Sequence, residues 1–408
     1  MSKKSKKSKK SKKSKKILYI SYDGILEPLG NSQVLKYLER LAGDFEITLL
    51  SFEKESTAMH ESELLKMHAH CLNKKILWRP QKYHQGLGAL SSLINIFHIT
   101  FTPFIEMLIN KHQIIHIRSY MPGLGVPILK LFFNFKFIFD IRGFWADEKV
   151  DRLGWKISSK KYKFFKGLES MLFKRADAVI TLTNSSKIFI EKEFNKPSDQ
   201  VNVIRTCVDF NEFNVEKKLQ ASGELNRKLN IGYLGSIDTA YDFNQFLQLV
   251  KDLDLREAEI HLTILSNTTK EIVTKYLRRN KLEHVNHEVL FLHRHELSSV
   301  INEFDFLGFA LKKSFSLIAS MPTKIAESLA CGTPIICNNF NPDIEEMMIE
   351  NKIGILHDFS ASLDENKYQE IIELIGDSST AEVCSNFSRK HFSLHGGVEK
   401  YQEIYNSL

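Results

Sequence analysis

The sequence predicts an α/β fold with two halves, each built on a parallel sheet. Short apolar runs alternate with stretches of helical spacing along the chain. The alternation starts again near residue 229, after the polar stretch 214–228. With 408 residues, the chain is also too long for one typical domain. These observations predict two α/β halves joined near residues 214–228.

The first half is expected to contain six strands, each with its polar loop. They are residues 16–24, 45–51, 112–117, 136–141, 177–183 and 200–204. A Gly-containing turn is expected over residues 27–33, and residues 33–41 have the apolar spacing of a helix. Further helical stretches separate the later strands.

The second half is expected to contain five strands. They are residues 229–234, 261–265, 287–292, 304–311 and 333–337. The strand at 304–311 precedes a polar loop over 312–319, and residues 323–330 then read as a helix that Gly332 terminates. Strand, loop, helix and strand form a βαβ unit.

The loop and helix of this unit, residues 320–334 (SMPTKIAESLACGTP), carry the residues that point to function. In doubly wound sheets, ligands bind at the carboxyl ends of the strands. Pro322 opens the helix, and the helix N-terminus and Lys324 suit a phosphate. Glu327, one turn in, suits the hydroxyls of a sugar. The alternative is that Pro322, Glu327 and Gly332 are ordinary helix punctuation.

The net charge of +7 comes from the N-terminus, where residues 1–16 contain five SKK repeats and ten lysines. Without them the chain is mildly acidic, which removes the support for nucleic-acid binding by the whole protein. The tail lacks apolar residues after Met1 and is expected to be disordered. It is expected to bind anionic lipid; the alternatives are a repeat without a role, or binding to acidic polymers or RNA. The five scattered cysteines indicate a reducing cytoplasm.

No transmembrane helix is expected. The best candidate, Leu90–Asn110, is interrupted by Asn95, His98, Pro103 and Glu106. Residues 124–141 are interrupted in the same way by Pro127 and by polar residues.

Seven segments in order resemble a known family. They are SYDGILEPLGNSQ, RSYMPGLG, FDIRGFWADEKVD, DAVITLT, IRTCVDFNEF, YLGSIDTAYDF and SMPTKIAESLACGTPII. Together they resemble a bacterial branch of the retaining glycosyltransferases with the GT-B fold, in the large family four group that builds surface polysaccharides. The resemblance extends from about Ile17 to about Tyr405.

The resemblance implies two Rossmann-like domains that face each other across a cleft. The implied acceptor domain spans residues 17–214, the implied nucleotide-sugar domain spans 215–385, and a C-terminal helix over 386–408 crosses back. It also implies sugar transfer with retention, from a UDP- or GDP-linked donor to a saccharide or lipid-linked acceptor, without a metal ion or other cofactor. The implied location is the cytoplasm, at the inner face of the membrane.

On the donor side, the family pattern has two glutamates separated by seven residues. Glu327 matches the second, which holds the ribose hydroxyls, but Ala319 stands at the first. This branch is expected to use an S-x-P-T-K loop instead, and the donor-binding residues that the resemblance implies are Gly235, Ser236, Ser320, Pro322, Thr323, Lys324 and Glu327. The family's diphosphate cations after the first strand of this half are missing, so we expect Lys324, with Lys312 or Lys313, to replace them.

In the first half, Arg142 stands where many members have a histidine. Arginine cannot act as a general base, but it can bind a phosphate or a sugar hydroxyl. We expect Arg142, Lys324 and Glu327 to be the catalytic residues; the alternative for Arg142 is a salt bridge to Asp140 or Asp147. Gly30 and Asn31 are expected beside the donor diphosphate. The expected acceptor-side residues are Asp23, Arg118, Trp145 and Asp147.

The basic, aromatic stretch 156–175 reads as a helix that rests on an anionic membrane surface, or as a core helix with a solvated lysine face. Other functions also fit the pattern. They are a GT-B epimerase or phosphorylase, and a non-catalytic protein that binds membranes or nucleic acid through its tail.

Overall fold

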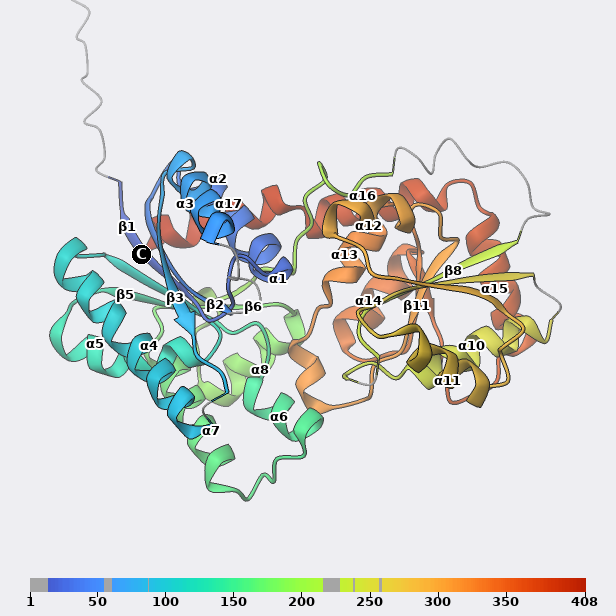
Figure 1. Ribbon diagram of the computed structural model, residues 1–408, viewed down its shortest axis with the longest axis horizontal. Helices are drawn as coiled ribbons and strands as arrows, with labels where there is room; N and C mark the ends of the chain where they lie inside the picture. The colour runs from blue at the N-terminus through green and yellow to red at the C-terminus, as the bar shows by residue number, and fades with distance from the viewer. Residues whose placement is uncertain (1–13, 55–60, 87, 216–227, 238, 257–258) are drawn as a thin grey trace, which may run out of the picture. The chain divides into compact units, whose positions relative to one another are not determined.

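The computed structural model describes residues 14–54, 61–86, 88–215, 228–237, 239–256 and 259–408. These residues form two parallel sheets, of seven and six strands, with helices packed around them (Figure 1). They divide into two compact units, of which one reaches to Ile138 and includes Leu408, and the other spans Phe139–Ser407. The α/β fold class with two doubly wound sheets, expected from the sequence, is confirmed.

The first sheet has the strand order β3-β2-β1-β4-β5-β6-β7. Its strands are β1 (Lys16–Ser21), β2 (Glu46–Lys54), β3 (Ile76–Tyr83), β4 (Ile114–Arg118), β5 (Lys136–Asp140), β6 (Ala178–Thr181) and β7 (Val201–Val203). Strand β1 pairs in parallel with β2 on one side and with β4 on the other. The strand order therefore reverses between β1 and β4, which makes this a topological switch point.

The helices of the first unit connect these strands. They are α1 (Pro28–Gly30), a π-helical turn (Asn31–Leu35), α2 (Lys36–Leu41), α3 (Glu61–Asn73), α4 (Ala89–Asn110), a 3-10 turn (Met121–Gly125) and α5 (Val126–Phe132). The expected turn over residues 27–33 is thus helical. A Cβ atom at Gly30 would lie 1.8 Å from the Gly24 carbonyl oxygen, so that only glycine fits this close packing.

Three helices follow β5 in the second unit: α6 (Trp145–Leu153), α7 (Lys160–Arg175) and α8 (Asn184–Phe194), with a 3-10 turn (Ser198–Gln200) before β7. Ser159 caps α7 and Thr183 caps α8, each accepting a backbone N–H three residues on. Serine and threonine are favoured at this position because their hydroxyls satisfy N–H groups that the helix leaves free.

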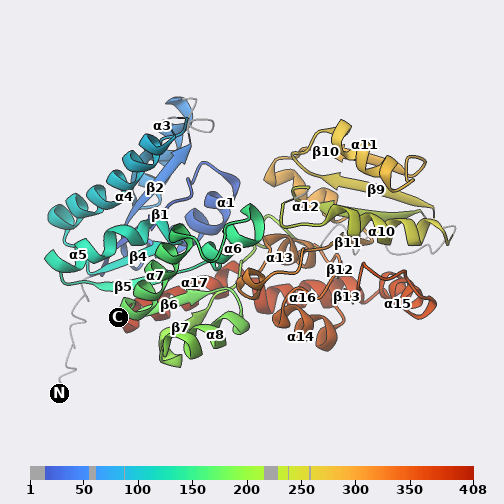
Figure 2. The ribbon, with the colours of Figure 1, turned by 90° about the horizontal axis from the view of Figure 1, so that it is seen from below.

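The second sheet has the order β10-β9-β8-β11-β12-β13 (Figure 2). Its strands are β8 (Leu229–Leu234), β9 (Ile260–Leu265), β10 (Asn286–Leu290), β11 (Phe306–Phe309), β12 (Ile335–Cys337) and β13 (Gly354–Leu356). Strand β8 pairs in parallel with β9 and with β11, so a second switch point lies between β8 and β11.

The helices of the second sheet are α10 (Phe243–Asp254), α11 (Lys270–Arg279), α12 (Arg294–Ile301), a 3-10 turn (Phe315–Ala319), α13 (Thr323–Ala330), α14 (Pro342–Asn351) and α15 (Glu365–Gly376). Helix α13 has the bounds that the sequence predicts. Every residue of β11 and β12 is buried, as expected for strands covered on both faces.

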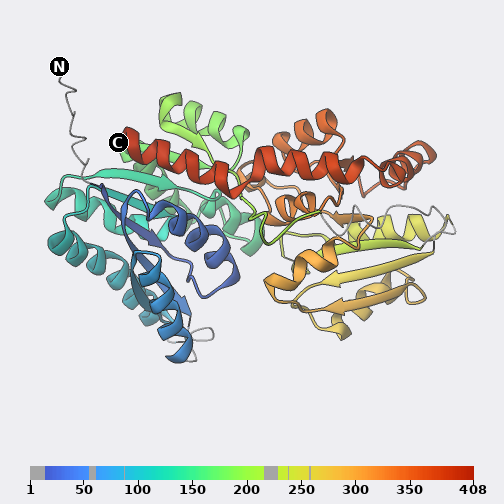
Figure 3. The ribbon, with the colours of Figure 1, turned by 90° about the horizontal axis from the view of Figure 1, so that it is seen from above.

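The C-terminal segment forms two helices, α16 (Thr380–Phe392) and α17 (Leu394–Ser407), which follow each other in red in Figure 3. They break at Ser393, where the Val208 N–H donates to the Phe392 carbonyl and the Val208 carbonyl accepts from the Leu394 N–H. The single helix expected over residues 386–408 is therefore interrupted. The domain boundaries remain a prediction, since residues 1–13 and 216–227 lie outside the described residues.

All eleven expected strands are present, and the described residues form two further strands that the sequence did not predict. Strand β3 contains Pro80, followed by the polar Gln81 and Lys82, and lies at the edge of its sheet, and β13 has only three residues. By length and composition, Leu90–Asn110 is long and apolar enough to cross a membrane, and 28% of its apolar window is buried. Its four polar or helix-breaking residues therefore do not make this segment too polar to cross a membrane, contrary to what we expected from the sequence.

Candidate functional site

The β8/β11 switch point carries most of the expected donor residues. Gly235 and Ser236 follow β8, and the chain after β11 leads through the 3-10 turn Phe315–Ala319 into α13. Because β8 and β11 are paired in parallel, their carboxyl ends lie at the same edge of the sheet. The sequence-distant segments around Gly235 and Lys324 therefore meet here.

Lys324 lies against this edge with its side chain buried. Its Nζ donates to the Leu234 carbonyl oxygen. The ammonium also lies over three aromatic rings, 3.6 Å from the centroid of Tyr241, 4.9 Å from Phe309 and 5.4 Å from Tyr233. These rings hold the cation by cation–π attraction while they exclude water from it.

Gly235 makes room for this arrangement. Its φ of +136° lies outside the range that side chains favour, and a Cβ atom here would lie 2.7 Å from Lys324 Nζ. Gly235 is one of the expected donor-binding residues, and in the structure the Lys324 ammonium borders the space beside it. Ser236 is half-buried, and its hydroxyl lies 2.6 Å from that of Thr239.

Burial changes the acidity of Lys324. Loss of hydration lowers the pKa of this ammonium to about 7, although the Glu327 carboxylate opposes the shift. A cation that loses its proton near neutral pH regains it when an anion comes close, because opposite charge favours the charged form. The Lys324 side chain is thus suited to take up a proton when a phosphate binds nearby.

Glu327 is buried one turn into α13 and is held by an arginine that the sequence analysis did not assign. Arg294 Nη1 donates to Glu327 Oε1 at 2.6 Å, and its Nε lies 3.3 Å from Glu212 Oε2. The guanidinium also lies 4.9 Å from the centroid of Phe213. Arg294 therefore fixes the orientation of the carboxylate. Arg294 is the first residue of α12.

Ser320, Pro322 and Thr323 are half-buried at the start of α13. The backbone before the helix is tied down by side chains from other elements. The Met321 carbonyl accepts from Thr206 Oγ1 at 3.0 Å, and the Ser320 carbonyl accepts from Asn341 Nδ2 at 2.8 Å. These bonds hold the loop in one position, as a preorganised binding site requires.

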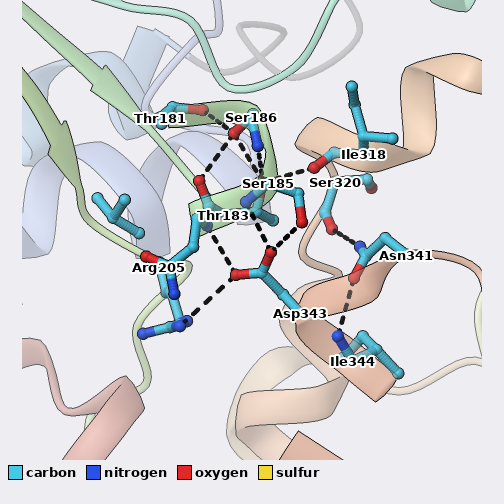
Figure 4. A network of polar contacts seen from close by, with 12 residues as sticks. Thr181, Thr183, Ser185, Ser186, Arg205, Ile318, Ser320, Asn341, Asp343 and Ile344 are labelled. Atoms are coloured by element: carbon cyan, nitrogen blue, oxygen red, sulfur yellow. Dashed lines mark hydrogen bonds and ion pairs between the residues drawn. The ribbon is translucent and has the colours of Figure 1, made fainter. Parts of the chain in front are cut away.

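Asp343 extends this network, which Figure 4 shows from close by. Its carboxylate accepts the backbone N–H groups of Asn184 (2.7 Å) and Ser185 (2.9 Å) at the start of α8, and the Ser185 hydroxyl (2.6 Å). Arg205 Nη2 lies 3.7 Å from the same carboxylate. Asp343 of α14 thereby supplies a carboxylate to the N-terminus of α8, where the helix dipole favours negative charge.

At the β1/β4 switch point of the first unit, Asp23 follows β1 and Arg118 ends β4. Arg118 Nε lies 3.6 Å from Asp23 Oδ2, and the carboxylate is 43% exposed while the guanidinium is buried. Gly30 and Asn31 stand where α1 passes into the π-helical turn. Glu53 fixes the preceding loop by accepting the N–H groups of Ile25 and Leu26.

Arg142 forms the salt bridge that was its alternative interpretation. Its Nε lies 2.9 Å from Asp140 Oδ1, and its Nη2 donates to the Tyr401 hydroxyl at 2.7 Å. Tyr401 of α17 donates in turn to Asp140 Oδ2 at 2.9 Å. Arg142 also has a left-handed φ of 56°, a strained conformation for a residue with a side chain. Its catalytic role remains a prediction.

Trp145 and Asp147 face α7. Asp147 accepts the Tyr162 hydroxyl at 2.7 Å and lies 2.9 Å from Lys166 Nζ, and the ring of Trp145 lies 4.6 Å from that of Phe165. These contacts use the aromatic stripe of α7 within the second unit. The arrangement fits the core-helix interpretation of residues 156–175, in which the lysines are solvated.

Among the residues that the structure describes, no group of three or more His, Cys, Asp or Glu side chains could hold a metal ion.

The second half of the chain is similar to a known protein family. Residues 214–391 match the model of the family Glycosyl transferases group 1, a stretch that includes Gly235, Arg294, Lys324 and Glu327. A search of the curated proteins finds no match.

Solved structures match nearly the whole chain. Sucrose-phosphate synthase from Thermosynechococcus elongatus aligns over 96% of this chain and 98% of its own, with a TM-score of 0.69 and 12% identity. A glycosyltransferase from Rickettsia africae covers 97% and 99%, with a TM-score of 0.67 and 16% identity. HepE of Anabaena in complex with UDP covers 96% and 100%, with a TM-score of 0.67 and 13% identity. The chain therefore has the GT-B fold, and its second sheet carries the part that is similar to the group 1 glycosyl transferases.

Proposed function

We propose that this chain is a retaining glycosyltransferase. It moves a sugar from a UDP- or GDP-linked donor to a saccharide or lipid-linked acceptor, without a metal ion, in the synthesis of a surface polysaccharide or glycolipid. One observation carries the proposal. The β8/β11 switch point joins a cation, Lys324, to a carboxylate that Arg294 orients, Glu327, within the stretch that matches the glycosyl transferase family.

The donor's diphosphate binds at the N-terminus of α13. The helix dipole and the Lys324 ammonium both attract its negative charge, and Pro322, Thr323 and Ser320 border it. Glu327 accepts hydrogen bonds from sugar or ribose hydroxyls, and Arg294 holds its carboxylate in one orientation while it does so. Glu327 and Arg294 thus supply the second contact to the same donor.

In the transfer, the bond between the anomeric carbon and the diphosphate breaks through an oxocarbenium-like transition state. The acceptor hydroxyl attacks from the face that the diphosphate leaves, and its proton passes to a leaving phosphate oxygen. No protein nucleophile takes part, so the protein contributes position and charge stabilisation. We assign Lys324 to the charge that develops on the leaving diphosphate, and Arg142 to a phosphate or sugar oxygen. Asp23, Arg118, Trp145 and Asp147 are assigned to the acceptor side, with Gly30 and Asn31 beside the diphosphate.

The structural neighbours suggest which donor to test first. HepE structures contain UDP, UDP with glucose, and UDP-glucose, and another neighbour is the lipopolysaccharide outer core galactosyltransferase WaaB. These ligands support a UDP-sugar as the first candidate for this chain. A cytoplasmic location is part of the proposal, because the five scattered cysteines fit a reducing compartment.

A thermal-unfolding panel with UDP-, GDP-, ADP- and CMP-sugars tests the donor. A ligand at about 100 times its Kd adds about 2.7 kcal/mol to the free energy of unfolding, so one member of the panel should raise the Tm clearly. Glu327→Ala, which keeps the fold, should show no such rise. If no nucleotide-sugar stabilises the wild-type chain, the donor assignment is wrong.

Turnover separates the enzyme from its alternatives. Release of nucleoside diphosphate that depends on a saccharide or lipid-linked acceptor supports a transferase, and the anomeric configuration of the product, read by NMR, tests retention. Formation of an isomeric nucleotide-sugar without an acceptor would indicate an epimerase instead. Release of a sugar phosphate from a glycan and inorganic phosphate would indicate a phosphorylase. Binding without any turnover would indicate a non-catalytic protein.

A further inference from the structure

Helix α4 has its apolar side facing outward. Its buried side is mixed, with the polar Ser91, Asn95 and Glu106 beside the apolar Ile99 and Met107. Its exposed large apolar residues are Leu90, Leu93, Ile96, Phe97, Phe101, Ile105, Leu108 and Ile109. A surface helix of a globular protein normally places apolar residues toward the core and polar residues toward water. The large exposed apolar side of α4 departs from this pattern and indicates an apolar environment outside the protein.

The buried polar groups of α4 are bonded, which fixes the helix in this orientation. The side-chain amide of Asn95 accepts the His84 N–H and donates to the His84 carbonyl, each at 2.9 Å. Glu106 accepts from Arg79 Nε of β3 at 3.0 Å and from Asn110 Nδ2 at 2.6 Å. Turning the apolar side inward would break these bonds and leave buried polar groups without partners.

Helix α5 continues the apolar surface. It runs beside α4 in both Figures 1 and 2, and its Leu131 and Phe132 are 80% and 65% exposed. The ring of Phe104 in α4 lies 5.4 Å from that of Phe132 and joins the two helices. We call the exposed apolar residues of α4 together with Ile128, Leu131 and Phe132 of α5 the α4–α5 face. A continuous apolar surface of this kind marks a site of interaction.

The lysine-rich tail joins the body at the same end of the sheet as this face. Lys16, the first residue of β1, accepts the Gln113 N–H at 2.9 Å, and the Gln113 carbonyl accepts the Lys136 N–H at 2.9 Å. Gln113 follows shortly after the end of α4 at Asn110, and Lys136 follows shortly after the end of α5 at Phe132. Lys16, the last of the ten lysines in residues 1–16, therefore lies next to the C-terminal ends of both helices.

We propose that the α4–α5 face docks on an anionic lipid bilayer, with α4 in the plane of the interface and the N-terminal lysines on the lipid headgroups. The α4–α5 face and the N-terminal lysines are attracted to the bilayer in two different ways. Buried apolar area holds the helices in the interface, and basic residues near it are drawn to acidic lipids. Stable attachment without a spanning helix requires two such signals.

Charge favours a membrane over a second copy of the chain. An interface between two copies through this face would bring two tails of ten lysines together, and like charges repel. An anionic surface instead attracts both the tail and Lys111 and Lys136 at the same end. The bonds of Asn95 and Glu106 to the unit's own residues oppose a spanning arrangement, in which α4 would have to leave the sheet.

Vesicle binding tests the proposal without any donor, so its failure is distinct from failure of the proposed function. The full chain is mixed with vesicles of phosphatidylglycerol and phosphatidylcholine, or of phosphatidylcholine alone, and bound protein is measured by flotation. The double variant Phe97→Glu/Phe101→Glu should bind the anionic vesicles about tenfold or more weakly, because each Phe loses its apolar burial. Deletion of residues 2–13 should weaken binding to a similar degree, and only on anionic vesicles.

Phe164→Glu is the matched control. Phe164 is 59% exposed on α7, as exposed as Phe97 on α4, and its replacement should leave vesicle binding unchanged. The uncharged variant Phe97→Ala/Phe101→Ala should also weaken binding, which guards against a loss due to misfolding or to the new charge alone. Circular dichroism and thermal unfolding check the fold of each variant.

Three outcomes would overturn the proposal. The first is binding that the tail deletion abolishes but that the α4 variants leave unchanged, which would mean that the tail acts alone. The second is an equal loss in Phe164→Glu, which would place the contact on α7. The third is a dimer in sedimentation that the α4 variants dissociate while vesicle binding persists, which would make the face an interface between copies.

Discussion

The two sheets share one kind of switch point but equip it differently. At β1/β4, Asp23 is 43% exposed and Arg118 Nε approaches it only to 3.6 Å. At β8/β11, Lys324 and Glu327 are both buried, one under aromatic rings and the other in a 2.6 Å bond to Arg294. The same topology thus gives an exposed carboxylate with a long ion pair in one unit, and a buried cation and a buried, hydrogen-bonded carboxylate in the other.

The two sites therefore differ in how far their side chains are arranged before a ligand binds. A buried cation and an oriented carboxylate are preorganised, so a ligand need not spend binding energy on arranging them. An exposed, loosely paired carboxylate remains free to adapt to different partners. We therefore assign the common substrate of many transferases, the nucleotide-sugar, to β8/β11, and the variable acceptor to β1/β4.

Glu327→Gln should have the largest effect. The change removes the charge that Arg294 orients and weakens the hydrogen bonds to the donor's hydroxyls, so the Kd for the donor should rise roughly ten- to a hundredfold. Glu212→Gln, which alters the other carboxylate beside Arg294, is the control and should change the Kd far less. Titration calorimetry measures both, and equal effects would remove Glu327 from the donor site.

Lys324→Met should come next. It keeps much of the volume but removes the ammonium, so the Kd for the nucleotide-sugar should rise about tenfold or more, while a nucleoside without phosphates should bind as before. Lys312→Met and Lys313→Met, which test the other expected cations, should have smaller effects because both lysines are exposed. A larger loss in either of them would transfer the diphosphate contact to that residue.

Arg142→Ala should lower turnover while leaving donor affinity nearly unchanged. Loss of one charge-stabilising donor typically costs about 2.7–4 kcal/mol in the transition state, which corresponds to a 10²–10³-fold lower kcat. Tyr401→Phe removes a hydrogen bond from Arg142 and Asp140 but keeps the guanidinium, so its kcat should stay close to that of the wild type. If both variants lose stability and turnover in parallel, Arg142 is structural.

Asp23→Asn should have the smallest effect on the donor and a clear effect on the acceptor. Because the carboxylate is exposed and weakly paired, its loss should leave the fold and the donor Kd within about twofold of the wild type. The KM for the acceptor should rise instead. A change in donor Kd with an unchanged acceptor KM would reverse the assignment of the two switch points.

The sequence predicted α13 with its correct bounds because its signals are local. Pro322 opens the helix, and Gly332 with a positive φ follows its end. The partners of its side chains are not local. Arg294 lies 33 residues from Glu327, and Tyr241 lies in the loop after β8, so no pattern around α13 could reveal either contact.

Helix α4 also shows that a local pattern does not reveal the distant partners of a helix. Asn95 and Glu106 looked like interruptions of an apolar segment, yet their bonds to His84 and Arg79 are what orient the apolar side outward. Strand β3 was missed because Pro80 and its charged neighbours mask a strand at the edge of the sheet. Residue patterns give the periodicity of an element, but the direction in which it faces depends on its partners.

Proton uptake on donor binding tests the central claim most directly, namely that Lys324 meets the diphosphate at β8/β11. Burial lowers its pKa to about 7, so the side chain is mostly neutral at about pH 8, and an arriving diphosphate should raise the pKa again. Calorimetry of nucleotide-sugar binding in two buffers of different ionisation enthalpy should therefore show proton uptake at this pH. It should show much less at about pH 6, where the ammonium is already protonated, and none in Lys324→Met. Binding without proton uptake near pH 8, or the same uptake in Lys324→Met, would contradict the account.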